Sequence, residues 1–248
     1  MGLRRSEAIV IGGHNLAEAD RIIPFYTRDL GIVRAVAQGA RRIRSRFVGS
    51  LEPFTHGHLV YFERPNRTLH SINEFAVLHA FPAVREDLER LAHAACVVEL
   101  VAVSSVEGDP NPELFVALLA ALDLLNAGAR PDIVLRAFEV KVLKLSGYLP
   151  ELHACVVCRR ALGEGAGASL NPHQGGLICS GCGQGLPAAA LSGPAVAFLR
   201  GAARLDVATA ARAQLPQGVP EELARALGQY LPHVLGRSLR SATFLERI

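Results

Sequence analysis

The sequence lacks any hydrophobic run long enough to cross a membrane. A membrane-spanning helix needs about 20 consecutive apolar residues, but the most apolar stretches, residues 91–106 and 114–125, are interrupted by Glu99 and Asp123. The first apolar stretch, residues 8–11, is too short for the core of a signal peptide. We therefore expect a cytoplasmic protein that has no contact with a membrane.

The common catalytic motifs are also missing. A GxxxxGK[ST] loop, which binds nucleotide phosphates, would have to contain Lys141 or Lys144, the only lysines, and neither is preceded by glycine. The sequence contains no GxSxG and no HExxH motif. Residues 163–167 are rich in glycine, but no strand–helix unit surrounds them, and we interpret them as a hairpin tip. The sequence therefore predicts a protein that is not an enzyme.

Charge is unevenly distributed along the 248 residues, although the whole chain carries a net charge of only +3. The net charge is +4 over residues 1–81, −4 over residues 82–150 and +3 over residues 151–248. A basic first segment followed by an acidic one favours a local anionic partner over general adhesion to anionic surfaces.

The first third of the chain has the pattern of a small β-barrel. Short runs rich in β-branched residues alternate with turn residues, and five strands are predicted over residues 8–11, 21–26, 32–37, 59–62 and 69–78. Five short strands at this spacing favour a small barrel.

Helical spacing replaces this pattern after Pro82. Apolar residues recur on one face of residues 88–102, and prolines or a Gly-Pro pair mark the starts of further helices. These helices are predicted over residues 113–125, 133–146, 193–205 and 220–239. The expected organisation is a multidomain α+β protein with a barrel at residues 1–81, a helical domain at residues 82–152 and 186–248, and a Cys- and Gly-rich insert at residues 153–185.

Four cysteines in the insert give the strongest chemical signal. Cys155 and Cys158 form one CxxC motif, and Cys179 and Cys182 form another, with 20 residues between the two. Each motif presents two thiolates to one side of a tetrahedral ion, which is typical of a structural Zn²⁺ ribbon with no open coordination position. An iron centre, disulfides or free thiols are the alternatives, although a reducing cytosol disfavours disulfides. The fifth cysteine, Cys96, is expected in the core.

A basic segment, residues 38–47, connects the third and fourth predicted strands. No acid lies between Asp29 and Glu52, and this interval holds five arginines: Arg34, Arg41, Arg42, Arg44 and Arg46. Guanidinium groups bind phosphates bidentately and stack on bases, and small barrels bind single strands through basic grooves and aromatic platforms. We expect these arginines to bind nucleic acid, and the candidate platforms nearby are Phe47, Phe54, Tyr61 and Phe62. The alternative is a solvated loop beside aromatic residues of the core.

Several stretches together resemble the RecO family of bacterial recombination mediator proteins over essentially the whole chain. They are residues 39–46 with 51–54, residues 69–74, residues 138–143 continuing into 147–150 and 155–158, and residues 235–241 continuing to 244–245. The resemblance depends on the order and spacing of these stretches rather than on any one of them.

This resemblance implies an N-terminal OB-fold, a helical domain and an inserted zinc ribbon, in agreement with the three blocks described above. It also implies a role in DNA repair and homologous recombination. Members of the family bind single- and double-stranded DNA, anneal complementary strands coated with single-strand-binding protein and, with RecR, promote loading of RecA. The expected location is the cytoplasm, in association with the nucleoid.

Such a role implies a second surface that receives the C-terminal tail of single-strand-binding protein, which is acidic and ends in apolar residues. An apolar groove rimmed by basic side chains would suit this tail. The candidates on the helical domain are Lys141, Lys144, Arg237 and Arg240, and ordinary surface charge is the alternative interpretation. Two other functions stay open at this point: a zinc-ribbon RNA-binding module of transcription or translation, and a nucleic-acid enzyme with a structural zinc.

Overall fold

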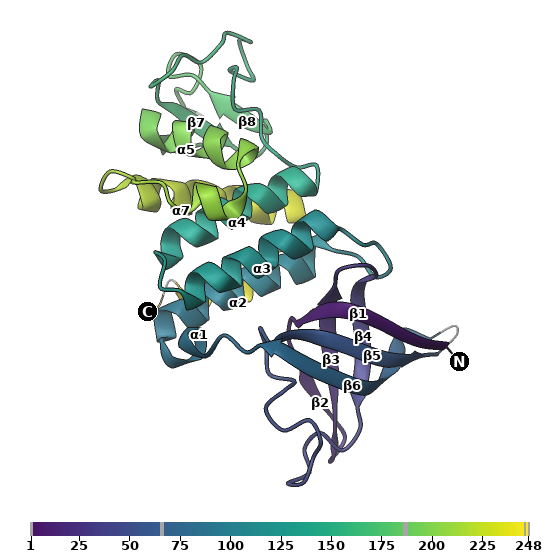
Figure 1. Ribbon diagram of the computed structural model, residues 1–248. Helices are drawn as coiled ribbons and strands as arrows, with labels where there is room; N and C mark the ends of the chain where they lie inside the picture. Colours follow the sequence, from purple (N-terminus) through teal and green to yellow (C-terminus); the bar gives the residue numbers. More distant parts are fainter. Residues whose placement is uncertain (1, 65–66, 186–187, 246, 248) are drawn as a thin grey trace.

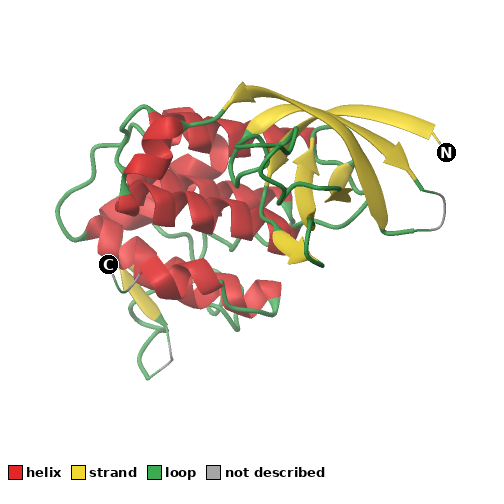
Figure 2. Ribbon diagram, turned by 90° about the horizontal axis from the view of Figure 1, so that it is seen from below, coloured by secondary structure: helices red, strands yellow, loops and turns green. Residues whose placement is uncertain are grey.

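The molecule has a barrel domain at one end, layered helices in the middle and a small cysteine-containing module at the other end (Figure 1). The computed structural model describes residues 2–64, 67–185, 188–245 and 247. Figure 2 shows the strands of the barrel separated by helices from the second, smaller group of strands. The predicted α+β class is confirmed.

A closed five-stranded barrel forms the first domain. Its strands are β1 (Gly2–Val10), β3 (Asp20–Thr27), β4 (Gly31–Ala37), β5 (His56–Glu63) and β6 (Leu69–His79). They follow the order β1-β5-β6-β4-β3, and a β1–β3 pairing closes the barrel. Only β4 and β6 are parallel. The five predicted strands are all present, and a further short strand that the sequence pattern did not reveal, β2 (His14–Leu16), pairs with β3.

Alternating side chains build the interior of the barrel. Ala8 and Val10 of β1, and Ile23 and Phe25 of β3, are fully buried there. Their two-residue spacing places each pair on the same face of its strand. The ring of Phe25 lies 5.3 Å from that of Phe75 on β6, measured between centroids. The barrel therefore has a hydrophobic core of its own.

Eight helices follow in the described part of the chain. They are α1 (Pro82–Glu86), α2 (Leu88–Ser104), α3 (Pro112–Asn126), α4 (Pro131–Leu145), α5 (Gly193–Arg204), α6 (Val207–Ala210), α7 (Val219–Leu235) and α8 (Arg240–Leu245). The Asp87 and Asn111 side chains cap α2 and α3 by accepting hydrogen bonds from the amides of Arg90 and Leu114. No helix among the described residues is long and apolar enough to cross a membrane.

The helix predicted over residues 220–239 is wrong at its C-terminal end. The chain leaves the helix at Gly236, which has a φ of 71°. Glycine adopts this left-handed conformation without steric cost, so it ends the helix efficiently. The chain then turns into α8, which packs against α2.

Helix α4 lies at the centre of the helical domain. It packs against α2, α3, α5, α6 and α7, and all residues from 133 to 140 are buried. Burial on every side explains why the mainly apolar sequence of this segment contains so few polar positions. Two of the buried residues, Arg136 and Glu139, are charged.

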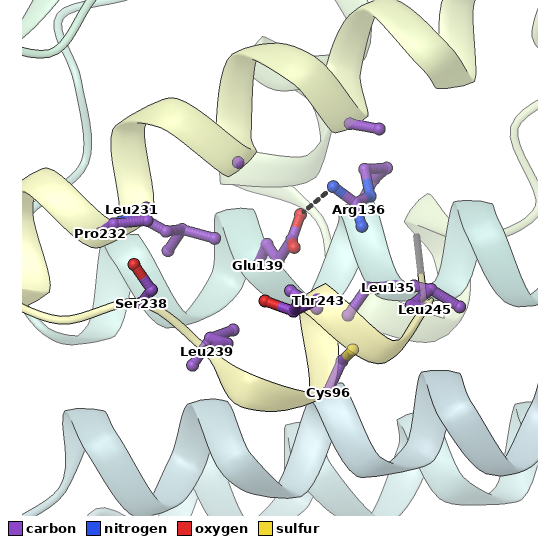
Figure 3. Close-up of a pocket in the computed structure, with 13 residues that line it drawn as sticks. Cys96, Leu135, Arg136, Glu139, Leu231, Pro232, Ser238, Leu239, Thr243 and Leu245 are labelled. Carbon is purple, nitrogen blue, oxygen red and sulfur yellow. Dashed lines mark ion pairs between the residues drawn. The ribbon is translucent and has the colours of Figure 1, made fainter. Parts of the chain in front are cut away.

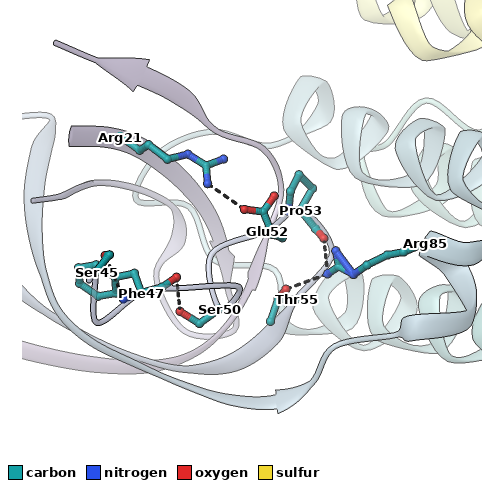
Figure 4. Close-up of polar contacts among 8 residues, drawn as sticks. All are labelled: Arg21, Ser45, Phe47, Ser50, Glu52, Pro53, Thr55 and Arg85. Atoms are coloured by element: carbon teal, nitrogen blue, oxygen red, sulfur yellow. Dashed lines mark hydrogen bonds and ion pairs between the residues drawn. The ribbon is translucent and has the colours of Figure 1, made fainter. Parts of the chain in front are cut away.

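Aromatic packing and an arginine of the first helix are among the contacts between the barrel domain and the helical domain. The rings of Tyr26 and Phe115 stack with centroids 6.3 Å apart. The Arg85 guanidinium on α1 donates hydrogen bonds to the Pro53 carbonyl at 2.8 Å and to the Thr55 hydroxyl at 2.9 Å (Figure 4). Hydrogen bonds to a charged donor are stronger than neutral ones, so Arg85 ties the end of the β4–β5 connection to the first helix.

The cysteine module is the part of the chain between the end of α4 and the start of α5. Its sheet consists of β7 (Ala168–Asn171), β8 (Gly176–Ile178) and β9 (Ala189–Leu191), with β7 in the centre. Strand β9 lies beyond residue 185, where we placed the end of the insert. The exact domain boundaries remain a prediction.

Candidate metal centre and nucleic-acid interface

The cysteines lie on two tight turns. At the first turn, the amide of Arg159 donates to the Cys155 carbonyl at 2.8 Å, and Arg159 itself is left-handed, with a φ of 61°. At the second turn, the amide of Cys182 donates to the Cys179 carbonyl at 3.0 Å. The amide of Cys179 also points to the Cys155 sulfur, 3.4 Å away. Backbone hydrogen bonds therefore bring the two CxxC motifs together.

The sulfur positions fit a tetrahedral metal ion. All four Sγ atoms lie within 4.8 Å of one another, and those of Cys158 and Cys179 are 3.8 Å apart. A tetrahedron with metal–sulfur bonds of about 2.3 Å has sulfur–sulfur edges of about 3.8 Å. No other group of three or more metal-ligating side chains occurs within residues 2–64, 67–185 and 188–245. The four predicted ligands are thus brought together as a candidate metal centre.

The acidity of two thiols reflects this crowding. Burial would raise the pKa of Cys155, but the amides of Cys158 and Cys179 donate to its sulfur and lower the pKa to about 6. Hydrogen bonding with the Cys179 and Cys158 sulfurs raises the pKa of Cys182 to about 12. Four thiols this close cannot all ionise without a cation between them.

The module is docked firmly on the helical domain. Arg200 of α5 donates to the carbonyls of Leu152 at 2.8 Å and Leu162 at 3.0 Å. The start of α5 lies so close to the glycine-rich turn that a Cβ on Gly193 would be 2.1 Å from the Gly165 carbonyl oxygen. Glycine at residue 193 is therefore required by space, and the segment interpreted as a hairpin tip packs against a helix.

The five arginines of the basic segment differ in what they already bind. Arg42 and Arg44 are exposed, and their guanidinium groups have no hydrogen bond or ion pair with any residue that the structure describes. Arg41, by contrast, donates to the carbonyls of Ala17 and Glu18 in the β2–β3 turn, at 3.1 and 3.0 Å. The free guanidinium groups are available to phosphates.

The remaining two arginines also have partners. Arg46 donates to the Ile72 carbonyl of β6 at 3.3 Å, and its guanidinium carbon lies 4.8 Å from the centre of the Phe47 ring. Arg34, on β4, forms an ion pair with Glu107 of the helical domain. Arg41 and Arg46 thus hold the segment to the barrel while most of their N–H groups remain unused.

Hydrogen bonds within the segment shape its turn. The Ser45 hydroxyl accepts from the amide of Phe47, and the Ser50 hydroxyl donates to the Phe47 carbonyl, both at 3.2 Å (Figure 4). Figure 4 also shows the ion pair between Arg21 and Glu52, 3.0 Å long, beside this turn. The basic segment is an ordered turn on the barrel surface.

The prediction of aromatic platforms beside this segment is wrong for three of the four residues. Phe47, Phe54 and Tyr61 are 5%, 5% and 2% exposed, because they pack into the cores beneath the segment and cannot stack on bases. Phe62 is 42% exposed. It lies opposite Leu3 in the β1–β5 register, which leaves it as the one candidate platform of the four.

A pocket of about 350 Å³ lies between α4, α7 and α8 (Figure 3). Its lining is mainly apolar, with Leu135, Leu231 and Leu239 among the side chains. Arg136 and Glu139 of α4 face it as an ion pair with N and O atoms 3.0 Å apart. Neither residue was predicted as a site residue, although two charges three residues apart in an otherwise apolar helix were a readable signal.

The predicted partner-binding residues lie at different places. Arg237 and Arg240 flank Ser238 and Leu239, which line this pocket. Lys141 lies instead in a second groove, beside Val116 of α3 and α6, and its ammonium group donates to the Leu205 carbonyl. Lys144 is exposed near the end of α4. The four basic residues therefore do not form one rim.

Two family models together match nearly the whole chain. The model described as "Recombination protein O N terminal" covers residues 1–81, and "Recombination protein O C terminal" covers residues 85–243. The chain belongs to the RecO family. As a RecO family member it is a DNA repair and recombination protein, and its closed barrel is the OB-like domain of that family.

Relatives share this similarity over nearly their entire length. The DNA repair protein RecO of Anaeromyxobacter sp. (strain Fw109-5) is 38% identical over 245 residues, which cover 97% of this chain and 94% of the relative. The proteins of the same name from Syntrophus aciditrophicus (strain SB) and Symbiobacterium thermophilum are 32% and 34% identical and cover 98% and 100% of this chain. Family membership therefore favours the DNA repair interpretation over an RNA-binding module.

Glu139 should give the RecO family member a pH-dependent stability. Burial raises the pKa of this carboxyl from 4.5 to about 7, although Arg136 opposes the shift. Between these pH values the folded protein holds a proton that the unfolded chain releases, so the stability linked to this group is greatest below pH 4.5 and is lost as the pH rises to about 7.

The substitution Glu139→Gln removes this titration. Relative to the wild type, the free energy of unfolding of the variant should rise by about 3 kcal/mol across that pH interval. Urea unfolding at a series of pH values measures the difference. If the free energy of unfolding changes with pH in the same way for both proteins, the Glu139 carboxyl has no raised pKa.

Proposed function

We propose that this RecO family member is a non-catalytic recombination mediator. It binds single- and double-stranded DNA on the barrel domain, anneals complementary strands coated with single-strand-binding protein and, with RecR, promotes loading of RecA. The observation that carries this proposal is the pair of free, exposed guanidinium groups of Arg42 and Arg44 on a closed OB-like barrel. The proposed location is the cytoplasm, in association with the nucleoid.

The DNA site that we propose has two parts. Arg42 and Arg44 contact phosphates first, and Arg41 and Arg46 contribute their unused N–H groups from the same segment. Phe62 is the exposed aromatic residue on which a base can stack. Contacts of this kind bind the backbone and the π-faces of bases, so the binding has little sequence preference.

Replacing Arg42 and Arg44 with Ala should weaken binding to single-stranded DNA. If each arginine contacts one phosphate, the slope of log K against log salt concentration should flatten by about 1.4. The matched control is Arg204→Ala with Arg225→Ala, which removes the same charge from exposed helical positions. Fluorescence anisotropy at several salt concentrations measures the slope, and strand annealing should fall in parallel. A slope equal to that of the control would remove this segment from the DNA site.

We further propose that the four cysteines bind a structural Zn²⁺ ion. The soft, four-sulfur donor set and the tetrahedral spacing of the Sγ atoms support zinc. Cys155, Cys158, Cys179 and Cys182 would complete the coordination sphere, which leaves no position for a reacting water. The ion would therefore hold the two turns together and take no part in a reaction.

The purified protein should contain about one equivalent of zinc, and Cys155→Ser should lose most of it. The same change should lower the melting temperature, because metal binding contributes to folding. Cys96→Ala is the control, since the buried Cys96 lies outside the four-cysteine cluster. Less than about half an equivalent of zinc in the wild type, or equal loss in both variants, would reject the proposed centre.

The pocket between α4, α7 and α8 suits the tail of single-strand-binding protein. An acidic tail with a terminal apolar side chain and a carboxylate needs an apolar cavity beside a guanidinium group, and this pocket offers Arg136 inside and Arg237 and Arg240 nearby. The raised pKa of Glu139 assists such binding, because the protonated carboxyl holds Arg136 less strongly.

Filling this pocket should abolish tail binding. We expect Thr243→Trp to weaken a labelled tail peptide at least tenfold, whereas Val116→Trp, which fills the second groove beside Lys141, should have no effect. A peptide without its terminal apolar residue should bind neither protein. Loss of binding in the Val116 variant alone would move the site to the second groove.

A further inference from the structure

The α2–α3 connection, residues 105–111, lies against the barrel domain. Glu107 forms isolated backbone bridges with Gly31 and Ile32 at the start of β4. A Cβ on Gly31 would lie 2.6 Å from the Asp109 carbonyl oxygen, and Gly31 also has a φ of 67°. Glycine at this position therefore allows the acidic connection to touch the barrel backbone.

Further contacts fix the position of this connection. The Tyr26 hydroxyl donates to the Asn111 carbonyl at 3.3 Å, and the Asn111 side chain caps α3. In Figure 1 the connection reaches from the ends of α2 and α3 to the near end of the barrel. The backbone that carries the Glu107 carboxylate is thus held at one place on the barrel surface.

Glu107 forms its ion pair with Arg34, which faces outward from β4. The neighbours of Arg34, Val33 and Ala35, are 5% and 0% exposed and face the barrel interior, so the alternation of a strand places Arg34 on the outer surface. The side chains of Arg34 and Glu107 are 45% and 36% exposed. Both can therefore rotate into solvent, and Arg34 can exchange one anionic partner for another.

This ion pair lies on the face of the barrel that binds oligonucleotides in OB-folds. OB-folds bind oligonucleotides on the outer face of their second and third strands and on the adjoining loops, and here β3 and β4 are the second and third strands of the closed barrel. Arg34 lies on that face, on the strand that leads into the basic segment. A carboxylate of the helical domain therefore neutralises the cation where a DNA phosphate would bind.

We propose that Glu107 competes with DNA phosphates for Arg34, so that the α2–α3 connection sets the DNA affinity of the barrel. This inference rests on the proposed function of the barrel as the DNA-binding domain. An exposed ion pair changes an equilibrium constant by no more than about fivefold. The contact therefore tunes the affinity and does not block the site, and it makes a residue of the helical domain a determinant of DNA binding.

Glu107→Gln tests the proposal, because it removes the charge while it keeps the size of the side chain. The variant should bind a single-stranded oligonucleotide about two- to fivefold more tightly than the wild type, with a salt dependence steeper by about 0.7. The control Glu164→Gln, at an exposed position in the cysteine module, makes the same change in net charge and should leave both quantities unchanged. Equal melting temperatures will show that both variants are folded.

The same substitution in an Arg34→Gln background isolates the pair. Here Glu107→Gln should have no effect, because the residue for which it competes is gone. A similar gain in affinity with and without Arg34, or no gain in a protein whose binding depends on Arg42 and Arg44, would overturn the inference and leave the proposed function intact. If the wild type binds no DNA, the proposed function itself fails.

Discussion

Burial of α4 is the constraint on which the helical domain depends. Five other helices pack on it, so its sequence has almost no position that faces water. Arg136 and Glu139 are charged residues within this buried helix, and they are tolerated because they pair with each other. An ion pair inside a helix core is not needed for stability, since apolar residues of similar size often serve as well. The pair lies beside the pocket between α4, α7 and α8, so its charged atoms face this cavity.

The basic segment shows that an arginine close to others in sequence is not always free to bind an anion. Five arginines lie close together in sequence, but Arg41 and Arg46 hold the segment to the barrel, and Arg34 is neutralised from another domain. Of the five, only Arg42 and Arg44 have guanidinium groups without a hydrogen bond or ion pair to the described residues. The number of arginines in the segment therefore overstates the number of cations that are unpaired at its surface.

Much of the architecture was readable from local patterns. The alternation of apolar residues in strands and the prolines at helix starts depend only on neighbouring residues. For this reason the five barrel strands and the main helices were predicted correctly. The grouping of the four cysteines was also predicted, because spacing within each CxxC motif is a local property. The end of α7 was missed, since Gly236 lies within an otherwise helical pattern and the turn into α8 depends on packing against α2.

Features formed between distant segments were not predictable in this way. Phe47, Phe54 and Tyr61 looked like base platforms, but the exposure of an aromatic ring is decided by what the rest of the chain places over it. The ion pair between Arg34 and Glu107 joins two domains, and the local sequence around either residue does not predict it. The pocket likewise forms between α4 and the much later helices α7 and α8.

The attachment of α8 has a mechanical consequence. The Glu99 carboxylate of α2 accepts hydrogen bonds from the amides of Arg240 and Ser241, at 3.0 and 2.8 Å, and so holds the first turn of α8, which follows the left-handed turn at Gly236. Ala242, Thr243 and Leu245 of α8 line the pocket, whereas α4 on another side of it is buried among five helices. One wall of the pocket therefore depends on a short helix whose first turn is held by the Glu99 carboxylate, so Glu99 contributes to the shape of the pocket without lining it.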